Sequence, residues 1–90
     1  MFQAHLVIVG KVQGVFYRAS CLEVAQELGL TGWVKNLLDG NVEVLAQGEK
    51  EKIEKLIEWC RKGPQGAKVS SVETDWQSIL EQAPSFDIAG

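Results

Sequence analysis

The segment at 49–62 constrains the fold more than any other part of the chain. Its apolar positions are Ile53, Leu56, Ile57 and Cys60, and charged side chains fill most positions between them. This i, i+3, i+4, i+7 spacing places the apolar residues on one face of an α-helix. Such a helix is stable mainly when that face packs against another layer, so the remaining segments must supply one.

The rest of the chain supplies a second helix and several short strands. Cys21, Leu22, Ala25 and Leu28 repeat at helical spacing, and Gly29 follows them as a helix-terminating residue. Runs of β-branched residues, with turn chemistry at 38–41, predict strands around the two helices. In chain order we predict a strand at 6–9, a helix at 19–28, strands at 32–35 and 42–46, a helix at 49–62, a strand at 68–76 and a short strand at 86–88.

The predicted order is β-α-β-β-α-β with a short fifth strand. Two helices in this order cover one face of an antiparallel sheet, which is the α+β arrangement called ferredoxin-like. A chain of 90 residues has the length of one domain and can bury a single core. We therefore expect residues 1–90 to form one domain.

Charge and hydropathy exclude several classes of function. Nine Lys and Arg residues against twelve Asp and Glu residues give a net charge of −3. Non-specific binding of nucleic acid needs Lys and Arg on many phosphates, so we expect no nucleic-acid partner. The apolar run at 6–9 is too short for a membrane span or a signal peptide, and no basic segment precedes it. The sequence predicts a monomeric cytoplasmic protein that does not bind membranes.

The two cysteines form no metal or redox motif. Cys21 and Cys60 are far apart in the sequence and lack CxxC spacing, and His5 is the single histidine. We therefore expect no metal site and no cofactor. Both thiols are predicted to be buried apolar side chains. A disulfide stays open as an alternative, since antiparallel packing of the two helices would bring the thiols together.

The segment at 10–18 joins the first predicted strand to the first predicted helix. Gly14 can adopt positive φ or let the backbone approach a ligand closely. Backbone N–H groups that turn inward just before a helix would form a cradle for an anion. The planar guanidinium of Arg18 is suited to two phosphate oxygens. A glycine-containing turn beside a solvated arginine has the same sequence, so the residues alone leave both interpretations open.

Asn36 stands at the end of the second predicted strand. The first two strands run parallel in this topology, so Asn36 and the loop at 13–18 are expected at the same edge of the sheet. A side-chain amide both donates to and accepts from water, which suits positioning a water molecule. An asparagine before a hairpin is also a common turn residue. We interpret Lys35 as a solvated strand residue rather than a second positive group.

Two long stretches resemble the signatures of acylphosphatases. They are G-K-V-Q-G-V-F-Y-R at 10–18 and G-W-V-K-N-L-L-D-G-N-V-E-V-L-A-Q-G at 32–48. The resemblance implies hydrolysis of the carboxyl–phosphate bond of acyl phosphates, without a metal or a covalent phosphoenzyme. It implies that Arg18 binds the phosphate and that Asn36 orients the attacking water. The substrate-binding residues that it implies are Gln13, Gly14, Val15, Phe16, Tyr17 and Arg18.

The chemistry of the residues agrees with these implied roles. A carboxylate is a stable leaving group, so catalysis can rest on positioning and on positive charge at the phosphoryl oxygens. Other interpretations stay open: an anion-binding or regulatory module without turnover, an acylphosphatase-like domain of the kind used in carbamoyl transfer and hydrogenase maturation, and a ferredoxin-like metal- or RNA-binding module. The missing CxxC spacing disfavours metal, and the acidic balance disfavours RNA.

Overall fold

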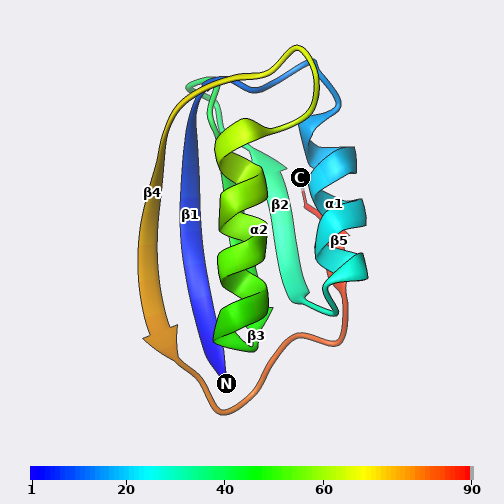
Figure 1. Ribbon diagram of the computed structural model, residues 1–90, viewed down its shortest axis with the longest axis vertical. Coiled ribbons are helices and arrows are strands. Elements are labelled where there is room, and N and C mark those ends of the chain that lie inside the picture. Colours follow the sequence, from blue (N-terminus) through cyan, green and yellow to red (C-terminus); the bar gives the residue numbers. More distant parts are fainter. Residues whose placement is uncertain (90) are drawn as a thin grey trace.

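A computed structural model describes residues 1–89 of the chain. Within these residues the elements follow the predicted order (Figure 1), with the short fifth strand at its predicted position. The elements are β1 (Phe2–Lys11), α1 (Tyr17–Glu27), β2 (Thr31–Asn36), β3 (Val42–Gly48), α2 (Lys50–Lys62), β4 (Lys68–Ser78) and β5 (Phe86–Ile88).

The five strands form one sheet in the order β4-β1-β3-β2-β5. β1 pairs antiparallel with β3 and β4, and β2 pairs antiparallel with β3. β1 to β4 thus form the predicted antiparallel sheet, and the short fifth strand β5 pairs parallel with β2, which makes the five-stranded sheet mixed. The reason lies in the connection after β4, which crosses below the sheet in Figure 1 and enters β5 from the end at which β2 begins.

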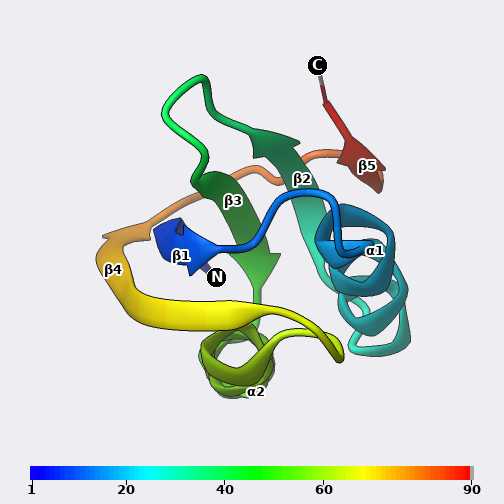
Figure 2. The same ribbon diagram turned by 90° about the horizontal axis from the view of Figure 1, so that it is seen from above.

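Both helices cover one face of the sheet and leave the other face open (Figure 2). The helical face of β1 carries Ala4, Leu6 and Ile8, each fully buried. The predicted apolar stripe of α2 is buried against them, which confirms the helix. Each fully buried Leu or Ile stabilises the fold by roughly 1.5–3 kcal/mol. Neither helix within residues 1–89 is long and apolar enough to cross a membrane.

α1 begins at Tyr17, two residues before the predicted start. Phe16 makes the turn into the helix, in the left-handed conformation with φ of 61° and ψ of 26°. This conformation costs a residue other than glycine roughly 1–2 kcal/mol, so helix-start patterns in the sequence do not indicate it. As a result Arg18 lies within the first helical turn.

Cys21 on α1 and Cys60 on α2 are both buried in the same core cluster. Both are free, and neither side chain is accessible to solvent. A hydrogen bond with Cys60, together with burial, raises the pKa of the Cys21 thiol well above its ordinary value. A thiol that is buried and resists ionisation reacts slowly, because the thiolate is the reactive form.

We therefore expect a thiol reagent to label neither cysteine in the native protein. After denaturation without reductant, the same reagent should label two thiols, the full cysteine content. Counting labelled thiols by mass spectrometry checks this. Label that enters the denatured protein only after reduction would show that a disulfide had joined Cys21 and Cys60.

Candidate active site

The connection between β1 and α1 has an open side on which a ligand can reach the backbone. Its ends are fixed in the core, because Val12 and Tyr17 are only 1% and 2% exposed. Between them, Gly14 has a φ of 77°, and a Cβ built there would meet no atom within 4 Å. Phe16 is 83% exposed. The predicted positive φ of Gly14 is confirmed, and the loop is held at its ends rather than along its length.

The backbone amides of this loop are without protein partners. In the part of the chain that the structure describes, the N–H groups of residues 14–19 donate no hydrogen bond to a protein acceptor. The next amide, that of Ser20, donates to the Phe16 carbonyl at 3.0 Å and starts the helix. Consecutive free amides at a helix N-terminus attract anions through their aligned dipoles. This arrangement favours the anion cradle over the simple turn.

Arg18 adds a full positive charge to the same place. It is half-buried, and within residues 1–89 no carboxylate forms an ion pair with it. The first turn of α1 carries no acidic side chain. The loop is therefore locally positive although the chain as a whole is acidic.

The side chain of Gln13 connects this loop to the turn between β2 and β3. Its Nε2 donates to the carbonyl of Leu37 at 2.8 Å and to the carbonyl of Asn41 at 2.8 Å. β1 and β2 both run antiparallel to β3, so they point the same way and end at the same end of the sheet (Figure 1). The predicted placement of Asn36 at the edge where the loop emerges is confirmed.

Asn36 carries a buried acceptor without a protein partner. It lies at the end of β2 on the same face as Val34, the face that packs under the helices. Its side-chain Oδ1 is buried and has no hydrogen-bond partner in the described chain. Buried acceptors are nearly always paired in native proteins, so a donor from outside the chain is the expected partner of this oxygen. An acceptor in this state can receive a hydrogen bond from a water molecule.

The segment at 63–67 packs behind the loop, and the sequence predicted it only as a helix break. A Cβ on Gly63 would lie 2.7 Å from the Tyr17 ring, and one on Gly66 would lie 3.6 Å from the Val15 side chain. The Tyr17 hydroxyl donates to the Cys60 carbonyl at 2.7 Å. The side chain of Tyr17 thus supports the loop from inside the core. The sequence signal for this packing was the pair of glycines on either side of residues 64–65, and both adopt positive φ in the structure.

The sequence profile of the acylphosphatase family matches residues 4–88 of the chain. The chain belongs to the acylphosphatase family. An acylphosphatase of Marinobacter nauticus is 57% identical over 82 residues, which cover 91% of this chain and 89% of that relative. An acylphosphatase of Pelotomaculum thermopropionicum is 45% identical over 87 residues, covering 97% and 95%. The crystal structure of acylphosphatase from Bacillus subtilis matches all of both chains with a TM-score of 0.96 and 33% identity.

These matches confirm the resemblance that the two sequence stretches indicated. They also confirm the ferredoxin-like arrangement, since the two structures agree over their whole length. Hydrolysis of acyl phosphates is the activity of the acylphosphatase family, which makes this chain a hydrolase.

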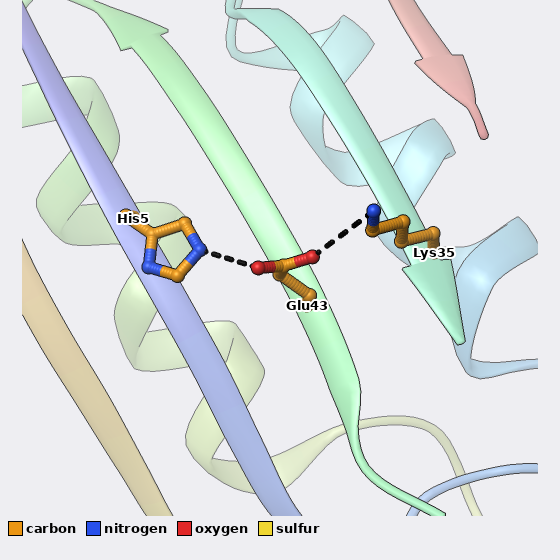
Figure 3. A network of polar contacts seen from close by, with 3 residues as sticks. All are labelled: His5, Lys35 and Glu43. Atoms are coloured by element: carbon orange, nitrogen blue, oxygen red, sulfur yellow. Dashed lines mark hydrogen bonds and ion pairs between the residues drawn. The ribbon is translucent and has the colours of Figure 1, made fainter. Parts of the chain in front are cut away.

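In this acylphosphatase, the open face of the sheet carries a charged network apart from the loop (Figure 3). His5 Nε2 lies 2.6 Å from Glu43 Oε2, and Lys35 Nζ lies 3.4 Å from Glu43 Oε1. Lys35 Nζ also lies 5.1 Å from the centre of the Trp33 ring. Lys35 and Glu43 belong to the second sequence stretch, yet the structure places them on the face opposite the helices. Glu43 is therefore engaged by two partners there.

We expect protonation of Glu43 to weaken the folded state in acid. The hydrogen bond with His5 and the ion pair with Lys35 lower the pKa of Glu43 from its ordinary value of 4.5. A carboxyl group with a lowered folded-state pKa adds stability above the unfolded value, and this stability is lost as the pH falls through the folded value. The free energy of unfolding should therefore decrease as the pH falls below 4.5.

The Glu43→Gln variant isolates this contribution in urea titrations at several pH values. Its free energy of unfolding should depend less on acid than that of the wild type, by up to about 1 kcal/mol for a partly exposed pair. Glu23→Gln is the matched control, because Glu23 is exposed on α1. Identical acid dependence in Glu43→Gln and the wild type would contradict the prediction.

A separate hollow lies away from the loop. A cavity of about 660 Å³ is lined by the start of β1, the end of α1 and the start of α2, with Phe2, Leu28 and Lys50 among its walls. None of the predicted site residues lines it. The candidate site is instead an open loop surface, which suits a small ligand held by its charged end.

Proposed function

We propose that this protein hydrolyses small acyl phosphates to a carboxylate and inorganic phosphate, with the loop at 13–18 holding the phosphoryl group. The observation that carries the proposal is the run of free amides at 14–19 beside an unpaired Arg18 within the described chain. Phosphoryl transfer is catalysed mainly by positioning and by stabilising charge on the phosphoryl oxygens. Arg18 would donate two parallel hydrogen bonds to these oxygens, and the amides would bind the others.

Asn36 would hold the attacking water by its side-chain amide. The water oxygen forms a bond to phosphorus while the bond from phosphorus to the acyl oxygen breaks, and the acyl group leaves as a carboxylate. The proton of the water passes to a phosphate oxygen, so the proposal needs no protein base. Support comes from the Oδ1 of Asn36, which has no protein partner in the described chain, and from the hydrogen bond of Gln13 to the Leu37 carbonyl, which joins the loop to the turn after Asn36. Neither a metal nor a cofactor takes part.

We also propose that the protein acts as a monomer in the cytoplasm, without a nucleic-acid or membrane partner. The net charge of −3 supports the absence of a nucleic-acid partner, because a polyanion would be repelled from most of the surface. Light scattering at several protein concentrations would test the monomer directly, with a mass near 9.9 kDa as the expected result.

The decisive experiment measures release of inorganic phosphate from acetyl phosphate in the presence of EDTA. We expect multiple turnovers that are unaffected by the chelator and inhibited by added phosphate. Binding of phosphate without turnover would support a regulatory anion-binding module instead. Activity that disappears with EDTA and returns with a divalent cation would contradict the metal-independent mechanism.

A further inference from the structure

Both N–H groups of the Gln13 side-chain amide are engaged within the protein, so the side chain has no donor left for a ligand. Both hydrogen bonds from Nε2, to the carbonyls of Leu37 and Asn41, measure 2.8 Å. An NH₂ group has two hydrogens, so both are engaged within the protein. The side chain of Gln13 is therefore not a phosphate ligand, although its backbone belongs to the loop.

The two acceptors belong to a turn that is fixed by its own hydrogen bonds. Leu37 N donates to the Asn41 carbonyl at 2.8 Å, and Gly40 N donates to the Leu37 carbonyl at 3.2 Å. The Asp39 carboxylate accepts from Asn41 N at 3.0 Å and from Asn41 Nδ2 at 3.2 Å. Gln13 thus binds to a frame that begins at the residue directly after Asn36.

The loop has few other means of keeping its place relative to this frame. It is anchored at its ends by the buried side chains of Val12 and Tyr17, which belong to the core beneath it. In the described part of the chain, the bonds of Gln13 are the side-chain hydrogen bonds that join the loop to the turn between β2 and β3. They set the position of the loop relative to Asn36, whereas the core sets its position relative to α1.

We propose that Gln13 is a positioning residue that fixes the distance between the phosphate cradle and the water held by Asn36. This inference rests on the proposed function. Phosphate binding and positioning of the water then depend on different contacts, because the amides and Arg18 belong to the loop and move with it. Without the bonds of Gln13 the cradle can still bind phosphate, but the water is no longer held in line with phosphorus. Misplacement of about 1 Å can lower a rate about a hundredfold.

The Gln13→Glu variant tests this role because it keeps the shape and removes both donors. At pH 7 the new carboxylate would face two carbonyl oxygens and be repelled by them. We expect kcat for acetyl phosphate to fall about 10- to 100-fold. Phosphate binding is judged on Gln13→Met, which adds no charge beside the loop, and its inhibition constant for inorganic phosphate should change by less than about threefold, the weight of a weak hydrogen bond. Rate measurements with phosphate as competitive inhibitor give both constants.

The pH profile supplies a readout that a purely structural defect would not produce. Protonation of the carboxyl group introduced by Gln13→Glu restores one donor, so the rate of this variant relative to wild type should rise as the pH falls toward about 4.3. Gln13→Met removes the donors without adding a charge, and its relative rate should stay low at every pH. Gln26→Glu places the same new charge on an exposed residue in the last turn of α1, away from the loop, and should behave as wild type.

Two results would overturn the role of Gln13 while the wild type remains active. One is a Gln13→Glu variant with wild-type kcat, and the other is a Gln13→Met variant whose loss of phosphate binding equals its loss of kcat. A wild-type protein that released no phosphate would instead overturn the proposed function itself. The two failures are therefore distinguished within the same set of measurements.

Discussion

Replacing Arg18 with alanine is expected to lower kcat/KM for acetyl phosphate at least about a hundredfold, because one preorganised donor to a developing anion is worth around 3–4 kcal/mol. Two features of the site make the loss large. Arg18 lies in the first turn of α1, where no acidic side chain offsets its charge, and no carboxylate of the described chain competes for it. Phosphate should also bind more weakly, since Arg18 contacts the ground state as well as the transition state.

Two further variants define what Arg18 contributes. Arg18→Lys keeps the charge but loses the planar fork, so we expect activity between those of the wild type and Arg18→Ala. Arg61→Ala removes an exposed arginine from the last turn of α2 and should leave the kinetics unchanged. Circular dichroism and urea titrations should show that each variant is folded. A folded Arg18→Ala protein with near-normal turnover would contradict the proposed function.

Hydrophobic periodicity predicted most of the fold. The stripe at Ile53, Leu56, Ile57 and Cys60 identified α2, because only one register of a helix buries all four side chains. Periodicity did not predict the direction of β5, since a strand of three residues carries no information about its partner. That direction depends on the path of the chain after β4. The start of α1 also differed, because Phe16 adopts a conformation that its residue type disfavours.

The sequence allowed us to propose the residues of the candidate site, but not the contacts that hold them in place. Gly14, Arg18 and Asn36 could be proposed because their chemistry is local: a positive φ, a guanidinium and an amide. The use of the Gln13 side chain could not be predicted, since its acceptors are main-chain carbonyls 24 and 28 residues away. Backbone carbonyls occur at every residue, so no sequence pattern marks those that accept from a distant side chain. Contacts of this kind become visible only in the folded chain.

Replacing Asn36 with alanine is expected to separate catalysis from binding. If Asn36 holds the attacking water, its removal should lower kcat about a hundredfold, the scale on which loss of orientation acts. The inhibition constant of phosphate should change by less than about threefold, because the loop amides and Arg18 remain. Measuring kcat and competitive inhibition by phosphate on the same preparation tests both expectations. Weaker phosphate binding with intact turnover of bound substrate would reverse the assigned roles.

The stability of the same variant supplies an independent test. The Oδ1 of Asn36 has no hydrogen-bond partner within the described chain, so alanine breaks no protein hydrogen bond to this atom. We therefore expect Asn36→Ala to unfold at nearly the same urea concentration as the wild type, while its turnover collapses. A structural asparagine would behave in the opposite way, because its loss would lower stability and activity together. A side chain that adds little to stability but is required for turnover serves the chemistry, and comparing the two unfolding midpoints with the two rates decides whether Asn36 is such a residue.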